Sequence, residues 1–121
     1  MNQINCLKKA ERNKAFLQNE IQLAKKYPDW ISVVAFYSAL HFVDAYLISK
    51  HGLHLIHHEE RDQAVAIHMG EVYSEYHRLY DLGFRSRYLR IEDNPTVEEA
   101  MEAVTLELQR VEELVKSSIN Q

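Results

Sequence analysis

Apolar residues recur along most of this chain at the three- and four-residue intervals of amphipathic helices. Residues 4–26 carry charges between the apolar positions, which predicts a helix with one buried stripe. Residues 30–50 are apolar nearly all round, which predicts a central helix packed on most sides. Residues 59–69 predict a shorter helix, and residues 71–90 a fourth helix with an aromatic-rich face. The last segment alternates four- and three-residue steps, the seam of a bundle helix: Val97, Met101, Val104, Leu108, Val111 and Val115.

Turn and capping residues mark where these helices begin and end. Pro28 is predicted to end the first helix, because proline disfavours the helical conformation of the residue before it. Asp29 is then a good N-cap for the second helix, and Gly52 is a stop signal after it. Thr96 and Glu99 have the spacing of a capping box, so the last helix is predicted to begin there.

The composition agrees with a helical fold. Hydrophobic residues make up 46% of the chain, enough for a core, while three glycines and two prolines leave few turns. We therefore predict a single all-α domain over residues 1–121, an antiparallel up-and-down bundle of about five helices. Gly83 costs its helix about 1 kcal/mol relative to alanine, so a weakening or bend is expected there.

Three features predict a cytoplasmic protein that does not cross a membrane. The single cysteine, Cys6, excludes an intramolecular disulfide, which fits a reducing compartment. The first 14 residues are polar and lack the apolar segment of a secretory signal. Asp44 interrupts the most apolar run, which favours a buried core helix over a membrane span.

Charge is spread unevenly around a net value of -4. Residues 1–28 carry +4, residues 29–90 carry -2 and residues 91–121 carry -6. An acidic chain binds nucleic acid poorly in bulk, although a local basic patch can still bind it. The simplest interpretation is that the first and last helices attract each other or expose charged faces.

Residues 51–68 hold five of the seven histidines, which raises the question of a metal site. His54, His57 and His58 lie beside Glu59 and Glu60, but neither the zinc pattern H-E-x-x-H nor the di-iron pattern E-x-x-H is present. Exposed histidines before a helix, whose first acids complement the helix dipole, explain the cluster better. We predict no metal and no cofactor.

Arg61 and His68 lie two helical turns apart in the same stretch, roughly 10 Å along one face. An arginine that stabilises phosphate charge and a histidine that moves a proton are suited to RNA cleavage by the 2′-hydroxyl. The alternative is an ordinary pair of surface side chains, since this spacing is common by chance.

Residues 77–90 interleave arginines with aromatic residues: Arg78, Tyr80, Phe84, Arg85, Arg87, Tyr88 and Arg90. Such a segment can hold phosphates and stack bases. The alternative is that one of these arginines neutralises Asp44 while the others are solvated.

Ser38, His41 and Asp44 recur every three residues on the central helix, within one sector of its surface. Side chains on one helix cannot align as a nucleophile and its base, so we interpret Ser38 and Asp44 as buried polar groups that need partners. Arg61, Arg85 and Arg87 are the candidate partners of this stripe.

The stretch "DWISVVAFYSALHFVDAYLISKHGLHLIHHEERDQAV" resembles the second and third helices of HEPN domains. The matching positions are Tyr37, Ala39 and His41, then Gly52, then His58 and Arg61. "LYDLGFRSRYL" is similar to a later segment of that family through Arg85, Arg87 and Tyr88, so the resemblance covers residues 29–90.

The resemblance implies a helical bundle that is commonly dimeric. Many HEPN domains are metal-independent ribonucleases, in toxin–antitoxin or phage-defence systems, with a late Arg-x4-6-His signature. Here Arg61 and His68 are the matching pair, and they lie earlier than the family's usual position.

Three hypotheses follow. The first is a non-catalytic HEPN-like domain that binds RNA, a nucleotide or another phosphate ligand, in which Arg85, Arg87 and Tyr88 face the ligand. Arg61, His58 and His41 would then lie nearby. The second is a ribonuclease that uses Arg61 and His68. The third is a homodimeric interaction module, and an antitoxin or a nucleotidyltransferase is a possible partner.

Overall fold

The computed structural model describes residues 2–119, which form an all-α antiparallel bundle. Its main elements are α1 (Gln3–Asn19), α2 (Pro28–His51), the shorter α3 (His58–His68), α4 (Tyr73–Tyr88) and a last rod. That rod consists of α5 (Val97–Glu102), a π-helical turn (Ala103–Glu107) and α6 (Leu108–Ile119). Short 3₁₀ turns lie at Ile21–Lys25, Gly70–Val72 and Ile91–Asp93. The predicted count of five helices is confirmed, with the last rod counted as one.

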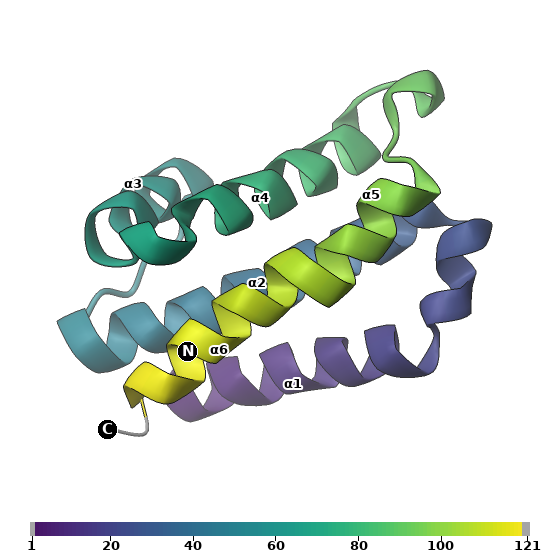
Figure 1. The fold of residues 1–121 in the computed structure, drawn as a ribbon. Coiled ribbons are helices and arrows are strands. Elements are labelled where there is room, and N and C mark those ends of the chain that lie inside the picture. The colour runs from purple at the N-terminus through teal and green to yellow at the C-terminus, as the bar shows by residue number, and fades with distance from the viewer. Residues whose placement is uncertain (1, 120–121) are drawn as a thin grey trace.

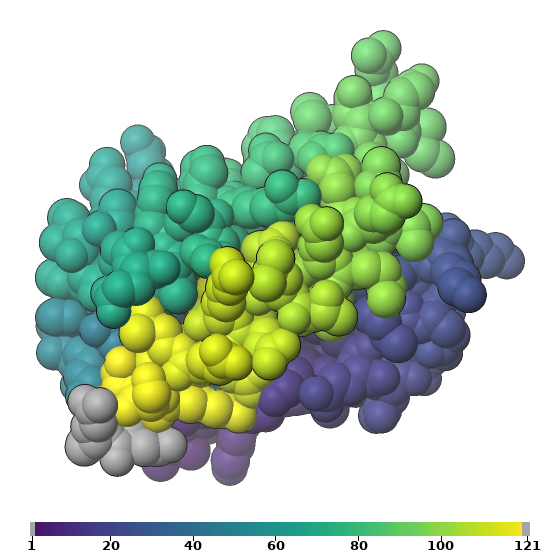
Figure 2. Space-filling view, viewed as in Figure 1, coloured from purple at the N-terminus to yellow at the C-terminus, as the bar shows by residue number. Residues whose placement is uncertain are grey.

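The long helices run up and down, and α2 lies at the centre (Figure 1). α2 packs against α1, α4 and α6, while the short α3 lies beside the beginning of α4. Figure 2 shows α6 crossing the face of the bundle between α1 and α4. α2 is long and apolar enough to cross a membrane, but most of that stretch is buried inside the bundle, as in a core helix.

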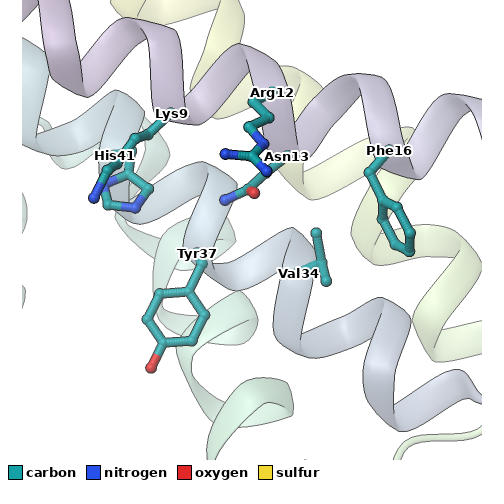
Figure 3. A pocket seen from close by; sticks show the side chains of 7 residues that line it. All are labelled: Lys9, Arg12, Asn13, Phe16, Val34, Tyr37 and His41. Carbon is teal, nitrogen blue, oxygen red and sulfur yellow. The ribbon is translucent and has the colours of Figure 1, made fainter.

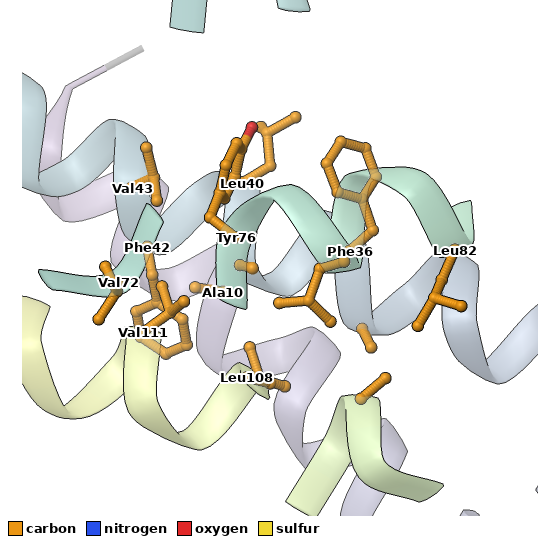
Figure 4. Packing of buried hydrophobic residues seen from close by; sticks show 14 of the residues in the cluster. Ala10, Phe36, Leu40, Phe42, Val43, Val72, Tyr76, Leu82, Leu108 and Val111 are labelled. Carbon is orange, nitrogen blue, oxygen red and sulfur yellow. The ribbon is translucent and has the colours of Figure 1, made fainter. Parts of the chain in front are cut away.

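The core gathers around α2 (Figure 4). Phe36, Leu40, Phe42 and Val43 of α2 meet Tyr76 and side chains from the other long helices. Phe36 and Phe42 are fully buried, and burying an aromatic or aliphatic side chain contributes about 1.5–3 kcal/mol. This explains why residues 30–50 are apolar nearly all round.

Two predicted boundary signals are confirmed and two are wrong. Gly52 ends α2 with a left-handed φ of 65°. The Thr96 and Glu99 capping box forms, with both reciprocal hydrogen bonds present. Pro28 does not end the first helix but begins the second, because proline at the first helical position loses no hydrogen bond. Asp29 consequently lies in the first turn of α2 and is not its N-cap.

The predicted seam of the last helix holds only in its second half. Leu108, Val111 and Val115 are buried, whereas Val97 and Met101 are exposed. The π-helical turn between them adds a residue to one turn and shifts the face that follows. Ala100 and Ala103, which the four-and-three spacing does not include, occupy the core instead.

Gly83 does not interrupt α4, contrary to the expected weakening. A β-carbon built there would lie 3.1 Å from the β-carbon of Phe36. Glycine therefore allows α4 to approach α2 closely, which offsets its poor helix propensity.

Candidate functional site

Arg61 forms a buried ion pair with Asp44. Its Nε donates to Asp44 Oδ1 at 2.7 Å and its Nη2 donates to Asp44 Oδ2 at 3.2 Å. Nη2 also donates to the Leu55 carbonyl at 2.9 Å, and Arg61 is only 4% exposed. The half-buried Asp44 thus has the arginine partner predicted for it, and this partner comes from α3 and not from α4.

His68 contacts His51 and Tyr46, not the pair of Arg61 and Asp44. Its ring stacks on the ring of His51, with 3.9 Å between centroids, and its carbonyl accepts a hydrogen bond from Tyr46. A phosphate-stabilising arginine needs donors that can reach the ligand, and those of Arg61 face Asp44 and Leu55. The arrangement therefore lends the ribonuclease hypothesis for Arg61 and His68 no geometric support.

Arg85 binds Glu99, a member of the capping box at the start of the last helix. Its Nη1 and Nη2 donate to the two carboxylate oxygens of Glu99 at 3.1 and 3.2 Å, and its Nε donates to the Asp93 carbonyl at 3.0 Å. Arg78 lies 3.7 Å from the same carboxylate, as expected for residues two turns apart on one face. The Arg85 hydrogen bonds hold the pKa of Glu99 below its usual range. Arg85 thus joins α4 to α5, away from Arg61.

Arg87 connects α4 to α2. Its Nη1 donates to the Tyr37 hydroxyl at 2.7 Å and its Nε donates to the Gly83 carbonyl at 3.0 Å. The guanidinium also lies over the rings of Phe36, Tyr37 and Tyr88 at 5.0 to 5.4 Å from their centroids. Arg87 makes no ion pair with a carboxylate among residues 2–119.

The His58 ring lies close to Arg61 and to the aromatic side chains around Arg87. Its ring packs at 5.7 Å from the rings of Phe36 and Tyr80, and Nδ1 lies 3.5 Å from Arg61 Nη1. Burial, followed by the positive charges of Arg61 and Arg87, lowers the pKa of His58. A neutral imidazole beside two guanidinium groups is the result.

A groove of about 510 Å³ lies between α1 and α2 (Figure 3). Its lining consists of Lys9, Arg12, Asn13 and Phe16 from α1 and of Val34, Tyr37 and His41 from α2. Lys9 lies beside His41, while the Tyr37 side chain points away from α1, toward Arg87 (Figure 3). The groove has two cationic side chains in its lining and no carboxylate.

The cations of this groove differ from most others in the chain. Lys14, two residues after Arg12 and so on a different face of α1, pairs with Glu112 of α6, and Lys116 pairs with Glu11. These contacts confirm the expected attraction between the first and last helices. Within the described chain, however, Lys9 and Arg12 form neither an ion pair nor a side-chain hydrogen bond.

His41 adds a titratable group to the groove. Burial lowers its pKa, Asp44 opposes this shift, and Lys9 and Arg61 add to it. His41 is thus largely neutral at pH 7, and an anion in the groove would raise its pKa. An anion there meets a lysine, a guanidinium and an imidazole that can take up a proton.

The structure therefore brings together only part of the predicted set. His41 lines the groove, and Arg87 touches it through Tyr37. Tyr88 packs on Arg87, whereas Arg61 and Arg85 have carboxylate partners. Sequence reasoning missed Lys9 and Arg12, and the only available signal was the excess of positive charge in residues 1–28.

Ser38 is structural: its hydroxyl donates to the Ala10 carbonyl at 2.9 Å in the core. In the part of the chain that the structure describes, no three His, Cys, Asp or Glu side chains are grouped to hold a metal ion. No protein-family model, no curated protein and no solved structure matches the chain.

Proposed function

We propose that this protein is a HEPN-like domain that binds RNA, a nucleotide or another phosphate-bearing ligand in the groove between α1 and α2. The observation that carries the proposal is the pair of cations, Lys9 and Arg12, which line the groove without a carboxylate partner in the described chain. A ligand phosphate supplies the missing counter-charge, and arginine can hold it with two parallel hydrogen bonds.

The rest of the chain makes this site selective. The net charge of -4 disfavours non-specific binding of polyanions. Binding therefore depends on a few local contacts, and its strength falls as salt displaces them. The family resemblance supports a toxin–antitoxin or defence setting for such a domain, but no contact in the structure bears on that setting.

The test compares two double variants that remove the same charge. Lys9→Ala/Arg12→Ala removes the groove cations, while Lys25→Ala/Lys50→Ala removes two exposed lysines outside the groove. Fluorescence anisotropy with a labelled single-stranded RNA gives the dissociation constant and its salt dependence. We expect the groove variant to bind at least about tenfold more weakly. Its log–log salt slope should fall by about 1.4, since each lost phosphate contact removes about 0.7.

The control variant should bind almost as wild type does. Equal losses in the two double variants would mean that net charge, and not the groove, determines affinity, and the proposal would be wrong. Circular dichroism of both variants checks the fold, which we expect to be intact because all four side chains are exposed.

A further inference from the structure

A second, apolar groove of about 360 Å³ continues the first along α1 and α2. Three aromatic side chains around it are exposed: Trp30 by 62%, Tyr27 by 43% and Phe16 by 42%. Trp30 is the only tryptophan of the chain. A large indole left this exposed on the longest core helix contributes little to folding, which raises the question of what it contacts.

Phe16 and Val34 line both grooves, so the apolar groove and the basic groove share a wall. On α2, Trp30, Val34, Tyr37 and His41 follow one another at steps of four, three and four residues and therefore lie on one face. On α1, Lys9, Arg12 and Phe16 recur at steps of three and four residues in the same way.

The two faces form one continuous track. Figure 3 shows Lys9 and His41 at one end of the basic groove and Phe16 at the other. From His41 to Trp30 the track covers eleven residues of helix, about 16 Å at 1.5 Å per residue. Positive charge thus lies at one end and exposed aromatic faces lie at the other.

We propose that this track binds single-stranded nucleic acid, with an unpaired base stacked on Trp30 and backbone phosphates farther along the strand held by Lys9 and Arg12. Sites for single strands combine cations that follow the backbone with aromatic faces on which bases stack. A base inside a duplex has no free face, and inorganic phosphate has no base, so neither ligand can stack on Trp30. The inference rests on the proposed function and narrows its ligand class.

Trp30 supplies the measurement, because stacking against a base changes its emission and no other tryptophan contributes. Four probes are titrated: a short single-stranded RNA without a terminal phosphate, the same sequence as DNA, a blunt duplex of that sequence, and tripolyphosphate. We expect saturable quenching by the single strands and little change with the duplex or with tripolyphosphate.

Variants separate stacking from charge. Trp30→Leu should bind the single strand about tenfold more weakly by anisotropy, within the range for loss of one stacked base, while its affinity for tripolyphosphate stays unchanged. Ile67→Ala removes an exposed apolar side chain on α3, outside both grooves, and serves as the control, with affinity near wild type. Circular dichroism confirms that Trp30→Leu is folded.

The outcomes distinguish this inference from the proposed function. If the single strand binds through Lys9 and Arg12 but Trp30→Leu binds equally well and emission does not change, the stacking inference is wrong and the proposed function stands. If no phosphate-bearing probe binds, both are wrong. If light scattering shows a dimer that Trp30→Leu dissociates, with no effect on RNA affinity, the apolar groove holds a second copy and the inference is also wrong.

Discussion

Replacing Arg61 by methionine should destabilise the fold strongly. The variant keeps an apolar stem but loses both hydrogen bonds to Asp44 and the one to the Leu55 carbonyl. Removing one partner of a buried ion pair costs about 3–5 kcal/mol, because the other charge is left without compensation. The Asp44 side chain keeps 17% exposure, so water can partly solvate it and the lower end, about 3 kcal/mol, applies.

The assay is urea denaturation followed by circular dichroism, with a thermal melt in parallel. A loss of about 3 kcal/mol lowers the melting temperature by roughly 10 °C for a domain of this size. Asp44→Leu and the double variant Asp44→Leu/Arg61→Met complete a double-mutant cycle. The double variant should be much more stable than the sum of the single losses implies, because neither charge is then left unpaired.

A change of less than about 0.5 kcal/mol in Arg61→Met would refute this reasoning, since that is the usual effect of a surface substitution. It would leave Arg61 free for another role, and the ribonuclease hypothesis would regain interest. Cleavage of RNA by wild type in the presence of EDTA, abolished in His68→Ala, would then be the direct measurement.

Four further predictions follow from the described contacts. Glu99→Gln should make the melting temperature fall less steeply in acid. The pKa of Glu99 is lowered in the folded protein, so its charge stabilises the fold above the usual pKa of 4.5, and this stability is lost as pH falls through the folded pKa. Glu107→Gln should raise the melting temperature at neutral pH, although the variant gives up the charge of the ion pair with Arg78. Burial raises the pKa of Glu107, so its charged form costs stability, and the gain should vanish below pH 4.5. His41→Asn should weaken the rise in RNA affinity as pH falls toward the lowered pKa of His41, measured by anisotropy, because only a histidine can take up a proton when the anion binds. Gly83→Val should lower the free energy of unfolding by about 1–3 kcal/mol, measured by urea denaturation. A β-carbon 3.1 Å from that of Phe36 overpacks the contact between α4 and α2.

The fold could be predicted because its signals are local. The apolar run over residues 30–50, the stop at Gly52 and the Thr96–Glu99 box each depend on residues within a few positions of one another. The buried face of the last rod was predicted wrongly in its first half, because no local signal in the sequence marks the change of register there. A π-helical turn at Ala103–Glu107 shifts the register by one residue, and the four-and-three spacing of the sequence gives no sign of it.

The site could be predicted only in part, because the partners of charged residues are distant in sequence. Arg61 and Asp44 are 17 positions apart, Arg85 and Glu99 are 14 apart, and Arg87 and Tyr37 are 50 apart. Sequence reasoning proposed arginines as phosphate ligands by residue type alone. Only the packing of the helices shows which of them already have a carboxylate.

The same pairing explains how an acidic chain can present a basic groove. α6 supplies Glu112 to Lys14, and α5 supplies Glu99 to Arg85, so acidic residues of the last rod neutralise cations on two other helices. Lys9 and Arg12 line the groove with α2 instead, and Asp44, which acts on His41 in that lining, is held by Arg61. Removing that arginine would therefore do more than destabilise the fold. It would leave an uncompensated carboxylate acting on His41, and the field in the groove would become less favourable for an anion. The ion pair thus connects stability to binding: an Arg61 variant that loses the positive charge and remains folded should also bind single-stranded RNA more weakly than wild type.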